Sequence, residues 1–204
     1  MTKAVGFIGL GVMGFPMAGH LSEHNKIAVF NRTKTKSEIW STKYKGKICS
    51  SPAEVAKISD VIILCVGDDN DVRDIVTGHQ GLLNNLKPES IIIDHTTTSA
   101  KLAKEMYELL DSNNVSYIDA PVSGGEVGAQ SGKLSIMVGG NKDAYNQIKN
   151  IIGPYTRLIK YMGLSGSGQY TKMVNQICIA GLIQALAEGI NFSEKVGLDS
   201  KSVL

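Results

Sequence analysis

The sequence predicts an α/β fold, with helices on both faces of a doubly wound parallel sheet and one long helix after it. Two observations support this prediction. Short apolar runs alternate along the chain with segments of helical periodicity. Residues 61–66 are apolar at every position, which is typical of a strand buried on both faces. Strands separated by helices form parallel sheets, and the ligand crevice of such a sheet lies at the C-terminal ends of its strands.

The first predicted strand, residues 4–8, leads into glycines spaced as G-x-G-x-x-G, and a helical pattern follows. In that context the glycines have separate tasks: a tight turn, close backbone approach to a pyrophosphate, and close packing of helix on strand. The helix start adds free N–H groups and a positive dipole end. A turn without a ligand does not explain three glycines at these offsets, so we predict a dinucleotide site. The residues expected to form it here are Gly9, Gly11, Val12, Met13 and Gly14.

The other predicted elements follow from apolar runs and helix-start signals. Further strands are predicted at residues 27–30, 61–66, 91–94, 115–119, 134–138 and 157–161. Helices are predicted from Ser51, which has capping-box spacing to Glu54, and at residues 99–110, 143–152 and 169–196.

The end of the second strand indicates which nicotinamide cofactor is bound. In NAD-binding sites, a carboxylate about 20 residues past the first glycine binds the ribose 2′-hydroxyl. This chain has Asn31, Arg32 and Thr33 there, and Lys36 within the next turn. A carboxylate repels a 2′-phosphate, whereas Arg, Thr and amide groups donate to one. The pattern favours NADP over NAD; the alternative interpretation of Arg32 is a solvated surface residue.

A second glycine-rich segment follows the strand at residues 115–119. Ser123, Gly124 and Gly125 expose a serine hydroxyl and consecutive backbone N–H groups, a concave set of donors suited to a carboxylate. No base lies near Ser123 in the sequence, which argues against nucleophilic catalysis by this serine.

The long helix opens with Gly-Ser-Gly at residues 166–168. Lys172 and Asn175 lie three residues apart on one face of its first turns. A lysine in this spacing is often an exposed surface residue, but the glycines at the start of the helix let its first turn approach another group closely. Both residues are therefore candidates for chemistry.

Composition excludes several classes of protein. The chain has 204 residues, is 43% hydrophobic and carries a net charge of +2 from scattered basic residues, which indicates neither a nucleic-acid-binding nor a membrane-binding face. No apolar run approaches the ~20 residues of a membrane span. The first strand begins by Ala4, so we expect no leader peptide and a cytoplasmic location.

The cysteines and histidines indicate no metal site. Cys49, Cys65 and Cys178 are widely spaced in apolar segments and are expected to be buried thiols. The four histidines show no ligand spacing, and most are expected at the surface or in loops.

The end of the chain predicts a fragment. Gly197 is a helix stop, and Asp199 or Ser200 would cap a new helix shortly before Leu204. We expect residues 1–163 to form the cofactor-binding domain, and residues 164–204 to form an interdomain helix and the start of a truncated helical domain. A natural short form is the alternative.

Three motifs occur in order: G-x-G-x-x-G, Asp-Ala-Pro-Val-Ser-Gly-Gly at residues 119–125, and Gly-x-Gly-x-x-x-Lys-x-x-Asn at residues 166–175. Together they resemble the β-hydroxyacid dehydrogenases, a family that includes 3-hydroxyisobutyrate dehydrogenase and is related to 6-phosphogluconate dehydrogenase. The resemblance spans nearly the whole chain and implies a Rossmann-like fold. Family members continue through an all-helical domain that closes the substrate cleft, and this sequence lacks it.

The resemblance also implies roles for individual residues. Ser123, Gly124 and Gly125 would hold the substrate carboxylate, Lys172 would be the catalytic acid and base, and Asn175 would orient the substrate. Thr97 matches the family's Asp-x-Ser-Thr stretch, which lies beside the nicotinamide and the substrate. At His95 and Thr96 this sequence varies from that stretch. Cys65 and Val66, at the end of a strand, join Thr97 in the expected cofactor site.

The sequence therefore predicts an NADP-dependent oxidoreductase that interconverts a small 3-hydroxy acid and its semialdehyde. The alternative is a non-catalytic or degenerate dinucleotide-binding module, and an imine-reducing relative is disfavoured by Lys172. Apolar residues spread around the long helix beyond one stripe. We therefore expect the chain to form a homo-oligomer through this helix, or to leave the distal half of the helix mobile, and to reduce hydroxy acids poorly or not at all by itself.

Overall fold

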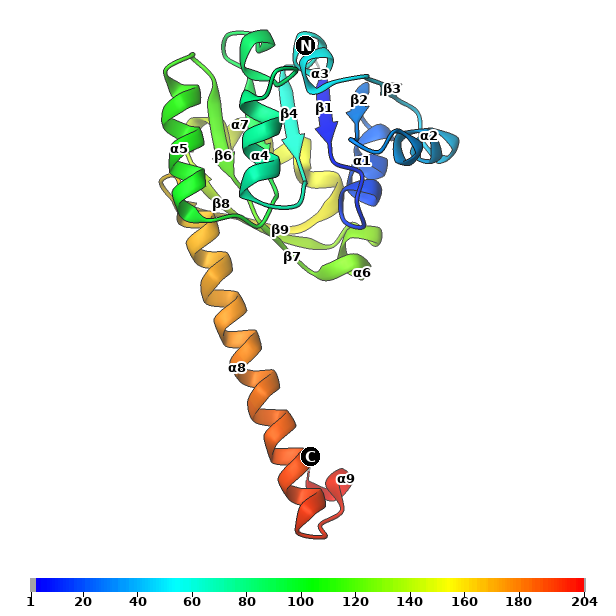
Figure 1. The fold of residues 1–204 in the computed structure, drawn as a ribbon, viewed down its shortest axis with the longest axis vertical. Coiled ribbons are helices and arrows are strands. Elements are labelled where there is room, and N and C mark those ends of the chain that lie inside the picture. The colour runs from blue at the N-terminus through cyan, green and yellow to red at the C-terminus, as the bar shows by residue number, and fades with distance from the viewer. Residues whose placement is uncertain (1–2, 204) are drawn as a thin grey trace.

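Across residues 3–203, the part of the chain that the computed structural model describes, nine strands form a single sheet (Figure 1). They are β1 (Val5–Ile8), β2 (Ile27–Phe30), β3 (Lys47–Ile48), β4 (Val61–Leu64), β5 (Ile91–Asp94), β6 (Ser116–Asp119), β7 (Val122–Ser123), β8 (Leu134–Gly140) and β9 (Thr156–Gly163). Their order is β3-β2-β1-β4-β5-β6-β8-β7, and β9 pairs with β8.

Helices lie between the strands and after them. The α-helices are α1 (Gly14–Ser22), α2 (Lys34–Lys43), α3 (Pro52–Ile58), α4 (Asp69–Thr77), α5 (Ala100–Asp111), α6 (Gly125–Gln130), α7 (Lys142–Ile152), α8 (Ser167–Lys195) and α9 (Ser200–Val203). Two 3₁₀ turns, η1 (Leu83–Asn85) and η2 (Gly153–Tyr155), complete the described elements.

The parallel part of the sheet confirms the predicted doubly wound fold. Strands β1 to β6 pair in parallel, with Val5 opposite both Ile27 and Val61. The chain goes from β1 outward to β3 on one side, then returns to β4 on the other side of β1. This reversal between β1 and β4 is the place where doubly wound sheets bind ligands.

Alternating side chains of the central strands form two cores. Val61 and Ile63 pack with Met17 of α1 and Trp40 of α2, whereas Ile62 and Leu64 pack against helices of the opposite face. That second core includes buried residues of α3, α4 and α5. Both faces of β4 are buried, as its continuous apolar sequence predicts.

One edge of the sheet differs from the prediction. Strand β8 runs antiparallel to both β6 and β7, so the sheet is mixed rather than wholly parallel. The connection from β7 to β8 contains only the six-residue helix α6. A parallel return needs a crossover of roughly a dozen residues or more, so this short connection reverses the strand instead.

Helix α4 was not anticipated, because its sequence is mostly polar. The Asp68 carboxylate accepts hydrogen bonds from the backbone N–H groups of Asn70 and Asp71 at 2.8 and 3.0 Å, which starts the helix. Only Val72 and Val76 of this helix are buried. Helix α2 and the two-residue strands β3 and β7 were missed as well, since short or polar elements carry little periodicity.

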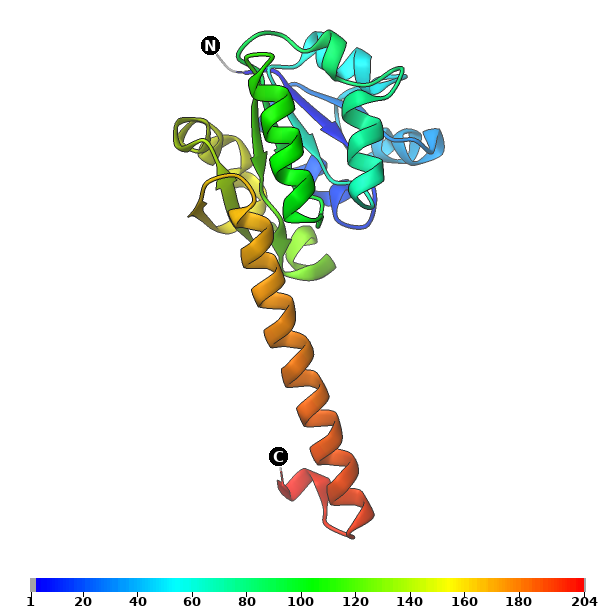
Figure 2. The same ribbon diagram turned by 60° about the vertical axis from the view of Figure 1, so that its left-hand side comes forward.

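Helix α8 leaves the sheet and runs away from it, so that its first turns lie beside the sheet and α9 lies beside its far end (Figures 1 and 2). Its apolar side chains are exposed along its length: Ile177, Leu182, Ile183, Leu186 and Phe192. By length and composition alone it could cross a membrane, with a mean hydropathy of 1.4 over 18 residues. Polar residues such as Gln176 and Gln184 interrupt its apolar ones, so the helix reaches this average without a continuous apolar run of about 20 residues.

The expectations for cysteines and histidines hold in part. Cys49 is buried and Cys65 is partly buried, but Cys178 is exposed because it lies on the free part of α8. His24 and His79 are exposed as expected, whereas His95 is buried.

Candidate active site

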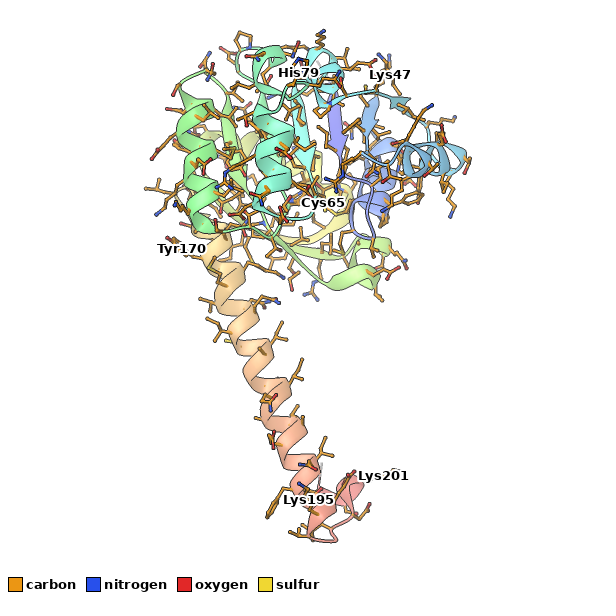
Figure 3. All side chains as sticks on the ribbon, viewed as in Figure 1. Lys47, Cys65, His79, Tyr170, Lys195 and Lys201 are labelled. Atoms are coloured by element: carbon orange, nitrogen blue, oxygen red, sulfur yellow. The ribbon has the colours of Figure 1, made fainter. Side chains whose placement is uncertain are left out.

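A cleft of about 470 Å³ lies at the C-terminal ends of β1, β2 and β4. It contains most residues of the predicted cofactor site: Gly9, Gly11, Asn31, Arg32, Thr33, Cys65 and Val66, together with Lys36. Its far wall is formed by α4 and the turn after it, including Asp71, Asp74 and His79, which sequence reasoning missed. Figure 3 shows Cys65 and His79 at opposite ends of α4.

The three glycines differ in the space around them, as their predicted tasks require. Gly9 has φ +100°, and a Cβ there would overlap the carbonyl oxygen of Cys65. A Cβ on Gly14 would overlap the carbonyl oxygen of Gly9, so this glycine permits close packing of α1 on the loop. Gly11 has no atom within 4 Å of such a Cβ and lines the cleft. Backbone at Gly11 is thus open to a ligand.

The residues between these glycines face different ways. Met13 lines a second cavity rather than the cleft, and Gly14 is buried. Val12 is 64% exposed and borders neither cavity. Of the predicted loop contacts, Gly9 and Gly11 therefore lie in the cleft itself.

Asn31 connects the two loops at the mouth of the cleft. Its Oδ1 accepts from the backbone N–H of Leu10 at 2.8 Å, and its Nδ2 donates to the carbonyl of Thr33 at 3.0 Å. An aspartate could not make the second bond, because a carboxylate has no donor. Arg32 follows on the rim, 82% exposed, with its guanidinium 2.8 Å from Asp71.

The second cavity, of about 520 Å³, adjoins the cleft along a shared wall of Cys65, Val66 and Gly67. It collects the residues predicted to bind substrate: Thr97, Ser123, Gly124 and Gly125, with Lys172 of α8. Gly124 and Gly125 have φ +135° and +60°, so their backbone conformation favours glycine. Residues from five separate parts of the sequence thus meet beside the cofactor cleft.

Lys172 is partly buried at this cavity, and burial lowers the pKa of its ammonium group. Asn175 is not among the lining residues; its Nδ2 donates to Gln176 Oε1 at 3.1 Å. Gln176, four residues after Lys172, lines the cavity instead. The i,i+4 spacing from Lys172 was the sequence signal for Gln176, and it was overlooked.

Two buried polar residues join the start of α8 to the sheet, and neither was singled out from the sequence. The Asp119 carboxylate accepts from the backbone N–H groups of Gly166 at 2.8 Å and Gln169 at 3.0 Å. The Gln169 side chain donates to the carbonyl of Thr96 at 2.8 Å and accepts from the N–H of Thr98 at 3.2 Å. Thr97, between these two threonines, is exposed to the cavity.

His95 joins the loop after β5 to the loop after β6. Its Nδ1 lies 2.6 Å from the carbonyl oxygen of Ala120, and its Nε2 lies 2.8 Å from the Tyr155 hydroxyl. A carbonyl only accepts, so Nδ1 carries the proton and Nε2 accepts from Tyr155. Burial lowers the pKa of His95 to about 4, which keeps the ring neutral.

Within residues 3–203, no three His, Cys, Asp or Glu side chains are grouped so as to hold a metal ion. The donors around both cavities are instead backbone N–H groups, hydroxyls, amides and basic side chains. Such a set suits phosphate and carboxylate groups.

Comparison with known proteins places the chain in a family. Residues 4–163 match the model of the NAD binding domain of 6-phosphogluconate dehydrogenase. The chain belongs to this family. It is 45% identical to an uncharacterized oxidoreductase of Shewanella frigidimarina, over 98% of this chain and 69% of that protein.

Two solved structures share this fold over nearly the whole chain, α8 included. Mycobacterium tuberculosis 3-hydroxyisobutyrate dehydrogenase with L-serine has a TM-score of 0.93 at 29% identity, and the match covers 100% of this chain and 69% of that one. Psf3 in complex with NADP⁺ and 2-OPP has a TM-score of 0.87 at 27% identity, covering 98% and 70%. The family match and the M. tuberculosis structure confirm the resemblance to the 3-hydroxyisobutyrate dehydrogenases.

We predict that His95 makes folding stability depend on pH. Between about pH 4, its folded pKa, and about 6.5, its ordinary value, the unfolded chain takes up a proton that the folded protein does not. The contribution of His95 to the free energy of unfolding is therefore complete above pH 6.5 and is lost as pH falls toward 4. Buried Asp94, whose pKa is raised to about 6, has the opposite dependence.

The variant His95→Gln keeps a donor and an acceptor but does not titrate. Urea unfolding at pH 4.5, 5.5 and 6.5 measures the slope of the unfolding free energy against pH. We expect the variant's slope to be more negative than the parent's by about 1 kcal/mol per pH unit, close to the limit for one proton. Equal slopes would mean that His95 is not buried as a neutral ring.

Proposed function

We propose that the chain is an NADP-dependent oxidoreductase that interconverts a small 3-hydroxy acid and its semialdehyde. One observation carries the proposal: the second cavity brings Lys172 together with Ser123 and Gly124, and it shares a wall with the cofactor cleft. L-serine, present in the M. tuberculosis structure, is itself a small 3-hydroxy acid, which supports this substrate class.

Each part of the cavity suits one part of such a substrate. The backbone N–H groups of Gly124 and Gly125 and the Ser123 hydroxyl would bind the carboxylate, as a concave set of donors does. Gln176 offers an amide to the substrate from the same helix as Lys172. Asn175 keeps its proposed orienting role only if its amide turns from Gln176 toward the cavity.

Lys172 would move the proton. Its partly buried position favours the neutral amine, which can take the proton from the substrate hydroxyl during oxidation. In the reducing direction the ammonium form returns that proton to the carbonyl oxygen. The shared wall of Cys65, Val66 and Gly67, together with Thr97, would hold the nicotinamide, whose chemistry when bound is hydride transfer.

NADP is proposed over NAD because of the charges at the cleft mouth. Arg32 and Lys36 line the cleft, and Asn31 occupies the place where NAD sites carry a carboxylate. The NADP⁺ complex of Psf3 supports this choice.

We expect the parent chain to bind NADP(H) more tightly than NAD(H), and Arg32→Ala to reduce that difference by about tenfold or more. The reason is that a hydrogen bond from a charged donor to phosphate is worth roughly 1.5–3 kcal/mol. Titration of the protein with both cofactors, followed by fluorescence, measures the difference. Equal affinities in the parent would refute the NADP assignment.

In a full-length version of the protein, we expect Lys172→Ala to lower kcat by about 10²–10⁴, the usual contribution of general acid–base catalysis, with little change in cofactor affinity. The assay follows NADPH oxidation with small semialdehyde acids. Lys101→Ala, at an exposed position of α5, is the matched control and should keep the parent rate. Normal turnover in Lys172→Ala would make Lys172 a surface lysine and remove the proposed mechanism.

The alternative, a non-catalytic dinucleotide-binding module, is less well supported, because such a module has no use for Lys172 beside a carboxylate-binding loop.

We further propose that residues 1–163 form the NAD(P)-binding domain and residues 164–204 an interdomain helix with the start of a helical domain, in a cytoplasmic protein. The family match over residues 4–163 supports this division.

We also propose that the chain forms homo-oligomers through α8. Nine large apolar residues on this helix are exposed, and each is worth roughly 1.5–3 kcal/mol when it is fully covered. Light scattering should give a multiple of the 21.9 kDa chain mass. A mass of one chain at all concentrations, with α8 protected from hydrogen exchange, would contradict this.

A further inference from the structure

One ion pair spans the mouth of the cofactor cleft. Arg32, just after β2, places Nη1 2.8 Å from Oδ1 of Asp71 in the first turn of α4. Both residues line the cleft from opposite walls. The guanidinium that would bind a 2′-phosphate is thus already paired with a carboxylate.

The two partners are held unequally. The other carboxylate oxygen of Asp71 accepts from the backbone N–H of Gly67 at 3.1 Å, and its side chain is only 26% exposed. Arg32 is 82% exposed, and Asp71 is the only hydrogen-bond or ion-pair partner that the structure shows for its side chain within residues 3–203. When a ligand competes for the Arg32 guanidinium, Arg32 can move while Asp71 stays in place.

We propose that Asp71 is a specificity-determining residue that competes with the 2′-phosphate of NADP for Arg32 and so limits the preference for NADP over NAD. This inference rests on the proposed binding of NADP at Arg32. It adds a second residue, on the opposite wall of the cleft, that sets the strength of that preference.

The competition follows from the chemistry of the three groups. A phosphate gains most from a guanidinium whose donors are all available, and here one donor is committed to Asp71. The ribose of NAD carries a hydroxyl in place of the phosphate and does not need Arg32. Removing the charge of Asp71 should therefore improve NADP binding and leave NAD binding nearly unchanged.

The test is Asp71→Asn, which has the same size and keeps an acceptor for the Gly67 N–H. We expect it to lower the Kd for NADP⁺ by about threefold to fivefold, the upper part of the range expected when a competing exposed ion pair is removed. The Kd for NAD⁺ should stay within twofold of the parent. Both constants are measured by titration calorimetry on the same preparations.

Two controls separate competition for Arg32 from a general charge effect. Asp74→Asn removes an equal charge from the same wall of the cleft, at a residue with no bond to Arg32, and should change the Kd for NADP⁺ less than twofold. In an Arg32→Ala background, Asp71→Asn should have no effect, because the pair is already broken. Thermal unfolding of each variant confirms that it is folded.

The outcomes distinguish this inference from the proposed function. A parent that binds NADP⁺ no better than NAD⁺, with no effect of Arg32→Ala, overturns NADP binding at Arg32 and the role of Asp71 with it. A parent that prefers NADP⁺ through Arg32, but whose Asp71→Asn variant binds NADP⁺ as the parent does or more weakly, overturns the role of Asp71 alone. An equal gain in Asp74→Asn, or a gain that persists without Arg32, also overturns it.

Discussion

The start of α8 meets the end of β6 through one buried carboxylate, that of Asp119, and the position of every residue on the helix depends on this contact. Burial raises the pKa of Asp119, while backbone N–H groups of Gly166 and Gln169 oppose that shift by bonding the ionised form. The positive end of the helix dipole favours the same form. Gly168 and Gly139 leave no space for a Cβ beside the carboxylate, so helix and sheet touch backbone to backbone.

The site is built outward from this junction. Gln169 bonds to both sides of Thr97, and Lys172 follows on the same helix three residues later. His95 holds the loop before Thr97 to the segment that leads into Ser123. The loop of Ser123, Gly124 and Gly125, the Lys172 side chain and the edge of the cofactor cleft are therefore held in one frame, although the far part of α8 has few neighbours.

Much of this was predictable from the sequence, and the failures have physical causes. Apolar runs identified the buried strands, and the glycine spacing identified the cleft, because both are local consequences of burial and backbone geometry. Helix α4, which carries Asp71, was missed because its sequence is mostly polar and only Val72 and Val76 are buried. Asp119 and Gln169 were missed because their role depends on contacts with segments 47 to 73 residues away. Gln176 lines the cavity where Asn175 was expected. The helix geometry decides which side chain faces the cavity, and the resemblance of the motif does not show this.

The most direct test of this account is to disturb the junction without touching the cavity. Gly168→Ala would drive a Cβ against backbone oxygens of Met137 and Asp119, whereas Gly181→Ala, farther along α8, meets no atom within 4 Å. Semialdehyde reduction by both variants should be measured at saturating NADPH, together with their thermal unfolding. The account predicts that Gly168→Ala loses most of its activity and stability, while Gly181→Ala keeps the parent rate and gains about 0.5–1 kcal/mol in stability. Full activity in a stable Gly168→Ala protein would contradict it.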